Sequence, residues 1–501
     1  MYTENNISIS DFVHALSEAV DLVSSNLNNH HKKVAYMSYA IASEIKLSND
    51  QTQDIILASL LHDISAFSIE EQIKMLQFES FDNLSNGHAL LGYKLLKDFA
   101  PLSKVATLIR HHHVNYRKTQ QDIPIGSYII HLADKIAILL DDNHEVLQQV
   151  PEIRAKIDQN QEGFHPKALA AFNRLADTEA FWVEAVSPPI DAIMSKNVRF
   201  SKEIIDLETL RAFAKVFAHL IDFRSRFTAT HSSGVAAVAL ELSSIDGFSE
   251  RECKLMEIAG FLHDLGKLTV PNSILEKNGP LDDEEIRCMR KHTYYTHAIL
   301  NKINGLGQIA AWASQHHERL DGSGYPFRMQ GENISKLARI MAVADIVTAM
   351  TEDRPYRPGM ERETVMKTLY SMSERGGIDK NIVELVNINF PRINEARIKA
   401  QAEAQQEYEA FHNDAKKEEP IRYIAPVVAP EPSYEQQRQA PGISRISGYR
   451  ESVTQTAIPK PARRRSAASK NQPEHSGEAT LGVAPTTRLK PKIASIDCKK
   501  A

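Results

Sequence analysis

Histidine and aspartate residues recur in this sequence in two ordered sets whose side chains could bind metal ions. The first set is His30, His62, Asp63, His88, His112, His113 and Asp134. The second set is His231, His263, Asp264, His292, His316, His317 and Asp345. Neutral imidazole and carboxylate groups suit divalent iron, manganese, zinc and nickel. We call the stretches that carry these sets the first copy and the second copy.

The two sets agree in spacing as well as in order. In both, 32 residues separate the first histidine from the His-Asp pair, and 24 separate the next histidine from the His-His pair. This second interval selects His112 and His113 from the run that begins at His111. The flanking segments agree too, LASLLHDIS with IAGFLHDLG. Because such agreement would rarely arise by chance, the sequence predicts an internal duplication.

Seven ligand-type residues in one copy exceed what one four-coordinate ion needs. An adjacent His-Asp pair at a helix end would let the carboxylate reach between two ions while the imidazole binds one. Two divalent ions a few Å apart are a common arrangement for phosphoester hydrolysis, because they polarise a phosphoryl oxygen and lower the pKa of water. The second copy therefore predicts a dinuclear metal centre, and the first set could form a second metal site.

The segments that carry these residues are predicted to be helical. SDFVHALSEAVDLVSS and DLETLRAFAKVFAHLID place apolar residues at three- and four-residue steps, the period of a half-buried helix. The helical pattern extends from Ser8 to about His412, and we find no alternating strand pattern. We therefore expect an all-α fold of two tandem helical bundles and a disordered C-terminal tail. The expected domains are residues 1–190, 191–400 and 401–501, with a junction near Pro188.

Composition narrows the class of protein. The chain has 501 residues, a formal net charge of -5 and three cysteines without paired spacing, so neither a disulfide framework nor a cysteine-based zinc site is expected. No apolar run reaches the roughly 18–20 residues that span a bilayer, and the N-terminus lacks a signal pattern. We expect a cytoplasmic protein without membrane insertion.

Charge is unevenly distributed along the chain. Residues 421–501 carry 14 Lys and Arg against 6 Asp and Glu, so the other 420 residues carry a net charge of -13. An acidic body argues against broad nucleic-acid binding, which needs a basic face. The tail is rich in Pro, Ser, Gln and Arg, which predicts disorder and a solubilising role. Its basic run, Arg463–Arg465, could contact an anionic partner.

The second copy resembles the HD-GYP domain, a branch of the HD phosphohydrolase superfamily. The matching segments are HDLGKLTVPNSILEKNGPLDDEE, HHERLDGSGYP and ARIMAVADIVTAMTEDRPYR, and the resemblance covers about Asp206 to Phe390. Known members are bacterial enzymes that hydrolyse cyclic dinucleotides, chiefly cyclic di-GMP, to pGpG or GMP; some prefer cyclic GMP-AMP. The resemblance implies a helical bundle with a dinuclear or trinuclear metal centre.

The resemblance also implies roles for single residues. One metal would be held by His231, His263, Asp264 and Asp345, and Asp264 would bridge to a second held by His292, His316 and His317. Asp264 and Lys267 would be catalytic, with Lys267 contacting a phosphate oxygen and stabilising developing charge. Arg354 and Arg357 would grip the phosphates or guanine of the substrate. Tyr325 would contact the substrate from the DGSGYP loop, which two glycines let turn tightly and a proline stiffens.

One departure from the family limits the number of metal ions. Trinuclear members carry a glutamate four residues before the first ligand histidine, and this chain has Phe227 there. We therefore expect two divalent ions, iron or manganese, with nickel or zinc as alternatives.

The first copy keeps all seven ligand-type residues but departs from the second elsewhere. Ala66 stands where the second copy has Lys267. Val114 stands where Glu318 would be, and the last interval is seven residues shorter at the DGSGYP loop. The first copy thus resembles an HD domain without the GYP motif. Three interpretations stay open: a metal-binding regulatory domain, a hydrolase for another substrate, or a packing partner. We favour a regulatory or packing role.

The leading hypothesis is a signalling phosphodiesterase that hydrolyses a cyclic dinucleotide, chiefly cyclic di-GMP, to pGpG or GMP. The alternatives are a 3',3'-cyclic GMP-AMP phosphodiesterase, a mononucleotide phosphohydrolase, and a receptor that binds a cyclic dinucleotide without cutting it. The complete ligand set and the HDLGK motif favour a catalyst. A protein partner could bind the first copy or the tail, and the chain could form a dimer.

Overall fold

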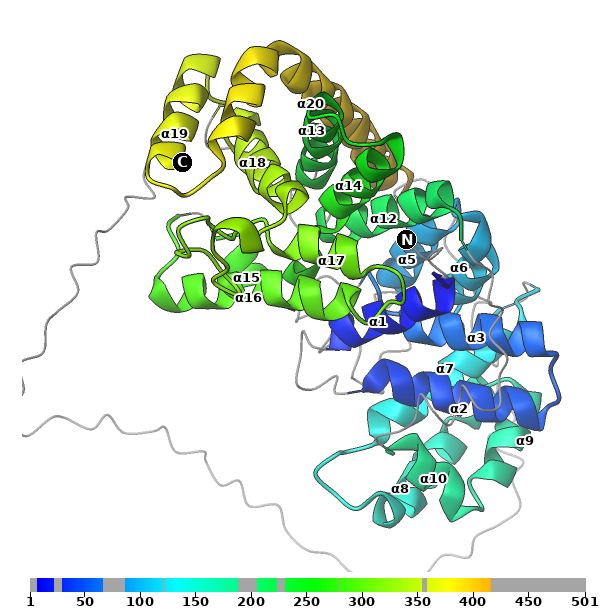
Figure 1. Cartoon of the computed structure of the whole chain (residues 1–501). Coiled ribbons are helices and arrows are strands. Elements are labelled where there is room, and N and C mark those ends of the chain that lie inside the picture. The colour runs from blue at the N-terminus through cyan, green and yellow to red at the C-terminus, as the bar shows by residue number, and fades with distance from the viewer. Residues whose placement is uncertain are drawn as a thin grey trace, which may run out of the picture. The chain divides into compact units, whose positions relative to one another are not determined.

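The computed structural model describes residues 7–21, 29–65, 86–119, 122–187, 205–222, 230–277, 279–353 and 358–415. Within these ranges the regular elements are α-helices and short 3-10 helices, without a β-strand (Figure 1). The expected all-α fold is confirmed. The tail beyond residue 415, the junction near Pro188, and Phe227 lie outside the described residues.

The first copy consists of helices that differ in length from about two turns to four. They are α1 (Ile9–Asp21), α2 (His30–Glu44), α3 (Asn49–Leu61), α5 (Asn86–Leu96), α6 (Ser103–Arg110), α7 (Ile125–Leu139), α8 (Val146–Gln159), α9 (Pro166–Leu175) and α10 (Glu179–Ala185).

The second copy adds a longer C-terminal helix. Its elements are α12 (Leu207–Asp222), α13 (His231–Ile245), α14 (Glu250–Leu262), the 3-10 helix η5 (Leu265–Thr269), α15 (Asn272–Leu275), α16 (Asp283–Leu300), α17 (Gly307–Ser314), α18 (Lys336–Thr351), α19 (Arg362–Glu374) and α20 (Lys380–Ala415). The two helices expected from apolar periodicity correspond to α1 and α12.

The duplication extends to the way helices begin and pack. Ser48 caps α3 in a capping box with Gln51, and Ser249 caps α14 in the same way with Glu252. In the first copy α2 packs on α3 and α7; in the second, α13 packs on α14 and α18 (Figure 1). Each copy thus holds the helix that starts with its first histidine against the helix that ends at its His-Asp pair.

Helix α1 contacts both copies. It packs on α2 and α3 of the first copy and on α16 and η5 of the second. Phe12 is buried against Phe213 and Phe217 of α12, at ring-centroid distances of 4.4 and 5.3 Å. Glu18 forms ion pairs with Lys32 of the first copy and Lys302 of the second. Since contacts of this kind cross between the copies, the domain limit near residue 190 stays a prediction.

The helix α20 continues through a proline. Pro391 lies inside it, and Asn389 leaves helical geometry with φ of -112° and ψ of 17°, which makes a kink. The described residues all belong to one compact unit. None of the described helices is long and apolar enough to cross a membrane.

Candidate metal centres

The seven histidine and aspartate residues of the second copy converge from five segments. His231 is the first residue of α13, and His263 directly follows α14. His292 lies in α16 and Asp345 in α18, and the pair that begins at His316 follows α17. The His-Asp pair, His263 and Asp264, lies at the end of α14, as expected.

Asp264 lies between histidines from different helices. Its Oδ2 is 3.1 Å from His263 Nε2, and its Oδ1 is 3.4 Å from His292 Nε2. On the other side of the cluster, Asp345 Oδ1 is 3.3 Å from His231 Nε2. The two oxygens of Asp264 thus face different ligand-type groups, as one carboxylate must if it is to serve two ions.

Backbone carbonyls fix the orientation of three of these rings. In His263, His292 and His316 the Nδ1–H donates to the carbonyl oxygen three residues earlier, at 2.6–2.8 Å. A neutral imidazole that donates through Nδ1 has only a lone pair on Nε2. These Nε2 atoms therefore enter the cluster as acceptors or metal ligands, because a metal-binding histidine is usually oriented by a hydrogen bond from its other ring nitrogen.

Burial keeps the imidazoles of His292 and His316 neutral. It lowers the pKa of His292 to about 4 and that of His316 to about 3, with neighbouring cationic groups adding to the effect. Burial alone would raise the pKa of Asp264, but His263 and Lys267 outweigh it and hold the pKa well below its ordinary value. At neutral pH His292 and His316 are thus neutral and Asp264 is ionised, the protonation states that bind divalent ions.

Glu352 holds the ring of His231 and was not predicted from the sequence. Its Oε2 accepts from His231 Nδ1–H at 3.0 Å and from the Gln401 side-chain amide at 3.2 Å. Burial would lower the pKa of His231, but Glu352 and Asp345 raise it to about 10. A lone glutamate after a helix gives no pattern to search for, and Gln401 reaches it only because α20 packs on α13.

Lys267 lies beside the cluster in η5. Its Nζ donates to Asp264 Oδ2 at 2.6 Å, and its side chain is 18% exposed. Burial would lower the pKa of Lys267, but Asp264, Asp345 and Asp222 outweigh it and raise the pKa. The ammonium group therefore stays charged at neutral pH and lies at the edge of the cluster.

The DGSGYP loop is closed by Glu318, whose role was not anticipated. The buried carboxylate of Glu318 accepts from the backbone N–H groups of Phe327 and Met329, at 2.7 and 2.9 Å. Gly324 passes so close to residue 318 that an added Cβ would lie 2.5 Å from its Cα. Val114 at the matching place in the first copy could not make these bonds, and the first copy has no such loop to hold.

The loop brings an aromatic ring to the cluster. The ring of Tyr325 lies 4.9 Å from that of His317, and the guanidinium of Arg290 lies 5.0 Å from the same tyrosine ring. Arg290 is an exposed cation beside the cluster that the sequence patterns did not single out. The predicted substrate contacts Arg354 and Arg357 lie outside the described residues.

The first copy assembles its seven residues in the same way. His62 Nε2 lies 3.2 Å from Asp63 Oδ2, His88 Nε2 lies 3.2 Å from Asp63 Oδ1, and His30 Nε2 lies 3.3 Å from Asp134 Oδ1. His112 and His113 complete the group around His88. Both copies thus contain histidine-aspartate clusters that could bind metal.

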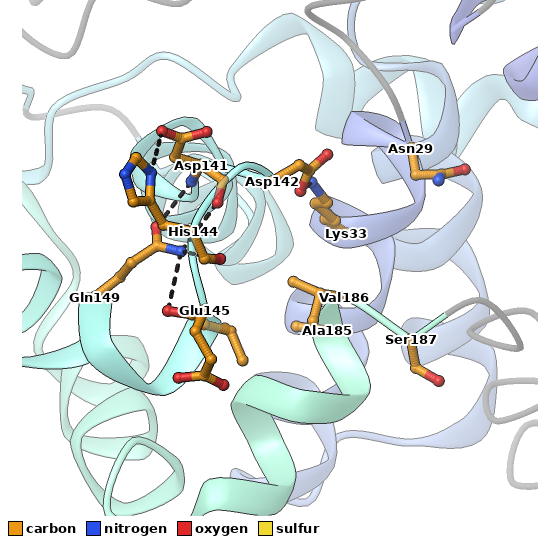
Figure 2. A pocket seen from close by; sticks show the side chains of 11 residues that line it. Asn29, Lys33, Asp141, Asp142, His144, Glu145, Gln149, Ala185, Val186 and Ser187 are labelled. Carbon is orange, nitrogen blue, oxygen red and sulfur yellow. Dashed lines mark hydrogen bonds and ion pairs between the residues drawn. The ribbon is translucent and has the colours of Figure 1, made fainter.

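A cavity of about 380 Å³ opens beside the start of α2, where Asn29 and Lys33 line it (Figure 2). Its lining includes the acidic side chains Asp141, Asp142 and Glu145, and one cation, Lys33, which is paired with Asp142. None of the seven ligand-type residues of the first copy lines it. Its acidic lining does not suit an anionic ligand.

Comparison with known families gives two matches. One HD-domain family model matches residues 215–382, and another matches residues 28–139.

Curated relatives match over one copy or both. The 3'3'-cGAMP-specific phosphodiesterase 1 of Vibrio cholerae is 28% identical over 399 residues, which are 76% of this chain and 92% of the relative. The cyclic di-GMP phosphodiesterase response regulator RpfG of Xanthomonas campestris is 36% identical over 170 residues, 34% of this chain and 44% of the relative. A crystal structure of a cyclic GMP-AMP specific phosphodiesterase of V. cholerae shares the fold, with a TM-score of 0.54 and 21% identity over 76% of this chain and 97% of that chain.

Proposed function

Since this chain belongs to the HD-domain family and carries two HD domains, we propose that it is a metal-dependent phosphodiesterase that hydrolyses a cyclic dinucleotide, with cyclic di-GMP as the leading substrate. The observation that carries the proposal is the arrangement in the second copy. There the seven ligand-type residues meet one another, a charged lysine and the DGSGYP loop. A second candidate substrate, 3',3'-cyclic GMP-AMP, is favoured by the relative of that specificity that spans both copies.

The donor atoms of the second copy fit metal ions. His292 Nε2 and His316 Nε2 face each other at 3.3 Å, and both rings donate through Nδ1 to backbone carbonyls. Two lone pairs at this distance repel each other unless a cation lies near both. This is the situation that a divalent ion with imidazole ligands relieves.

We assign two ions to the second copy. The first would be held by His231, His263, Asp264 and Asp345, and the second by Asp264, His292, His316 and His317. Iron or manganese is the proposed metal. When bound, such ions supply a Lewis acid for a phosphoryl oxygen and increase the acidity of water.

The chain's own groups do the remaining work. Lys267 donates to a phosphate oxygen and stabilises the charge that develops there. Tyr325 contacts a base, and Arg354 and Arg357 bind the phosphates or guanine of the substrate. The exposed edges of the cluster are the side chains of His317, 25% exposed, and Lys267, 18% exposed, so the substrate enters on this side.

The test is turnover of cyclic di-GMP and, in parallel, 3',3'-cyclic GMP-AMP by the full chain loaded with Mn²⁺ or Fe²⁺. Asp264→Ala should reduce turnover about 100-fold or more, because it removes the bridging carboxylate. The matched control is Asp63→Ala, the same change in the first copy, which should retain turnover. Loss of turnover only in Asp63→Ala would overturn the assignment to the second copy.

A second measurement separates catalysis from binding. Equilibrium dialysis with each labelled dinucleotide reports affinity without turnover. If the metal-loaded chain binds either dinucleotide but cuts neither, it is a receptor and the proposed activity is wrong.

A further inference from the structure

A histidine outside the duplicated set lies inside the first cluster. His31 follows His30 in α2 and is 1% exposed. Its Nδ1 forms a hydrogen bond with the carboxylate of Asp21, the last residue of α1. Because a carboxylate accepts, Nδ1–H is the donor, and in the neutral imidazole Nε2 then carries the lone pair. Among the described residues this buried Nε2 has no hydrogen-bond partner.

His31 lies beside two members of the first set. Ligand atoms of His31, His62 and Asp63 all lie within 4.8 Å of one another. The Nδ1–H of His62 donates to a backbone carbonyl at 2.8 Å, which leaves the Nε2 of His62 as the ring nitrogen available to a metal ion. Two buried imidazoles and a carboxylate meet here. Among the described residues, the Nε2 atoms of both imidazoles and Oδ1 of Asp63 lack a hydrogen-bond partner. Buried polar atoms without a partner are costly, and a divalent ion would bind all three groups.

In the second copy, a different residue pairs with the aspartate that precedes the first histidine. Asp222 precedes His231 by nine residues, as Asp21 precedes His30. Its partner is Ser232, which takes the place of His31 and donates through N–H and Oγ at 3.2 and 2.9 Å.

The cation beside the second His-Asp pair is a side chain. Lys267 Nζ lies 2.6 Å from Asp264, and the first copy has Ala66 at that place in the sequence. The two copies thus differ by an exchange: the second has a serine and a lysine where the first has His31 and an alanine.

We propose that His31, oriented by Asp21, is an additional ligand of a metal centre in the first copy, which takes a divalent transition ion such as zinc, iron or manganese. The Asp–His pair is the usual way to orient a metal-binding imidazole. The added ligand fills a coordination position that the second copy leaves open, and the sequence has Ala66 in place of the lysine that we assign to phosphate binding in the second copy. The first centre therefore holds its ion without turning over a phosphoester. This inference does not depend on the activity of the second copy.

The experiment measures metal binding by the full chain. His263→Ala with Asp264→Ala disables the second centre, and metal content and the dissociation constants for Zn²⁺ and Co²⁺ are then measured. Adding His31→Ser, which copies Ser232, should weaken binding about 10–100-fold and change the visible absorption of bound Co²⁺. Asp21→Asn should weaken binding less, because its amide oxygen still accepts from Nδ1.

His111→Ser is the matched control, since His111 lies next to a ligand residue but belongs to none of the clusters. It should leave metal affinity and the Co²⁺ spectrum unchanged. Far-ultraviolet circular dichroism of each metal-free variant reports folding. Unchanged affinity and spectrum in a folded His31→Ser variant would overturn the proposal, as would the absence of bound metal when only the second centre is disabled.

Discussion

Asp222 is a buried carboxylic acid that the duplicated pattern did not include. Burial raises its pKa to about 7, and the opposing effects of His231 and Ser232 are smaller. An unfolded aspartate has a pKa of about 4. Between these values the folded chain keeps a proton that the unfolded chain has lost. The stability contributed by Asp222 is therefore present at low pH and declines as pH rises from about 4 to about 7.

Replacing this acid should remove that part of the pH dependence. For the metal-free chain, Asp222→Asn should gain stability relative to the parent between pH 5 and pH 8, by an amount on the order of 1–4 kcal/mol. Urea unfolding at the two pH values measures it. Asp158→Asn, a change at an exposed position of α8, should show no such gain. An equal gain in both variants would contradict the role of burial.

Among single residues, the sequence predicted the members of each cluster but not the groups that orient them. Order and spacing were enough for the seven residues because both copies repeat them. Glu318 and His31 occur in one copy only, so self-comparison could not find them. The place of Glu352 is taken by Asp141 in the first copy, so the glutamate itself is not repeated. Asp21 and Asp222 do repeat, nine residues before each first histidine, and the same comparison could have found them.

Among the elements, η5 is pressed against α16. A Cβ on Gly266 would lie 1.9 Å from the carbonyl oxygen of His292. The N–H of Gly266 donates to Thr296 Oγ1 at 2.9 Å, and that hydroxyl donates to the carbonyl of His263 at 3.0 Å. The first copy has Ser65 at the matching place, where its hydroxyl donates to the carbonyl of His88 at 2.6 Å.

Gly266→Ala should separate η5 from α16 and displace a ligand histidine. We expect a loss of about 1–3 kcal/mol in the free energy of unfolding and lower metal content of the second copy. Chemical denaturation and metal analysis check both. Gly307→Ala is the control, since its Cβ would meet only Asn301 Oδ1, at 3.8 Å. Unchanged stability and full metal content in Gly266→Ala would contradict this prediction, because the backbone would then have moved to accept the added methyl group.

Helix positions were largely predictable, and short elements were not. The three- and four-residue apolar period located α1 and α12 because each buries one face. Neither η5 nor α15 is long enough to show a period. The packing of η5 on α16 follows from a single glycine and a threonine, which carry little weight in a periodicity argument.

Across the whole molecule, α1 is a shared element. Phe12 is 1% exposed and packs on two rings of α12. Phe12→Ala should cost about 3–5 kcal/mol, because it removes a buried ring and leaves a cavity. The loss should lower the thermal transitions of both copies together. Scanning calorimetry measures this, with Ile388→Ala at a position that is 72% exposed as control. A lower transition temperature in the first copy alone would mean that α1 does not couple the stabilities of the two copies.

The sequence predicted two copies but not how they share a helix. Periodicity shows that a helix has an apolar face, not which helix covers it. Phe12 and Phe213 stand at matching places, 18 residues before His30 and His231, but this repetition does not show that the two matching helices pack on each other. Their contact depends on how complete helices pack.

The shared helix also sets an order of events during synthesis. Phe12 leaves the ribosome about 200 residues before Phe213, so one apolar face of α1 has no partner while the whole first copy is made. Contacts between residues so distant form late and slow folding, and an apolar surface exposed meanwhile favours aggregation. The nascent first copy is therefore expected to need chaperone protection until α12 has emerged.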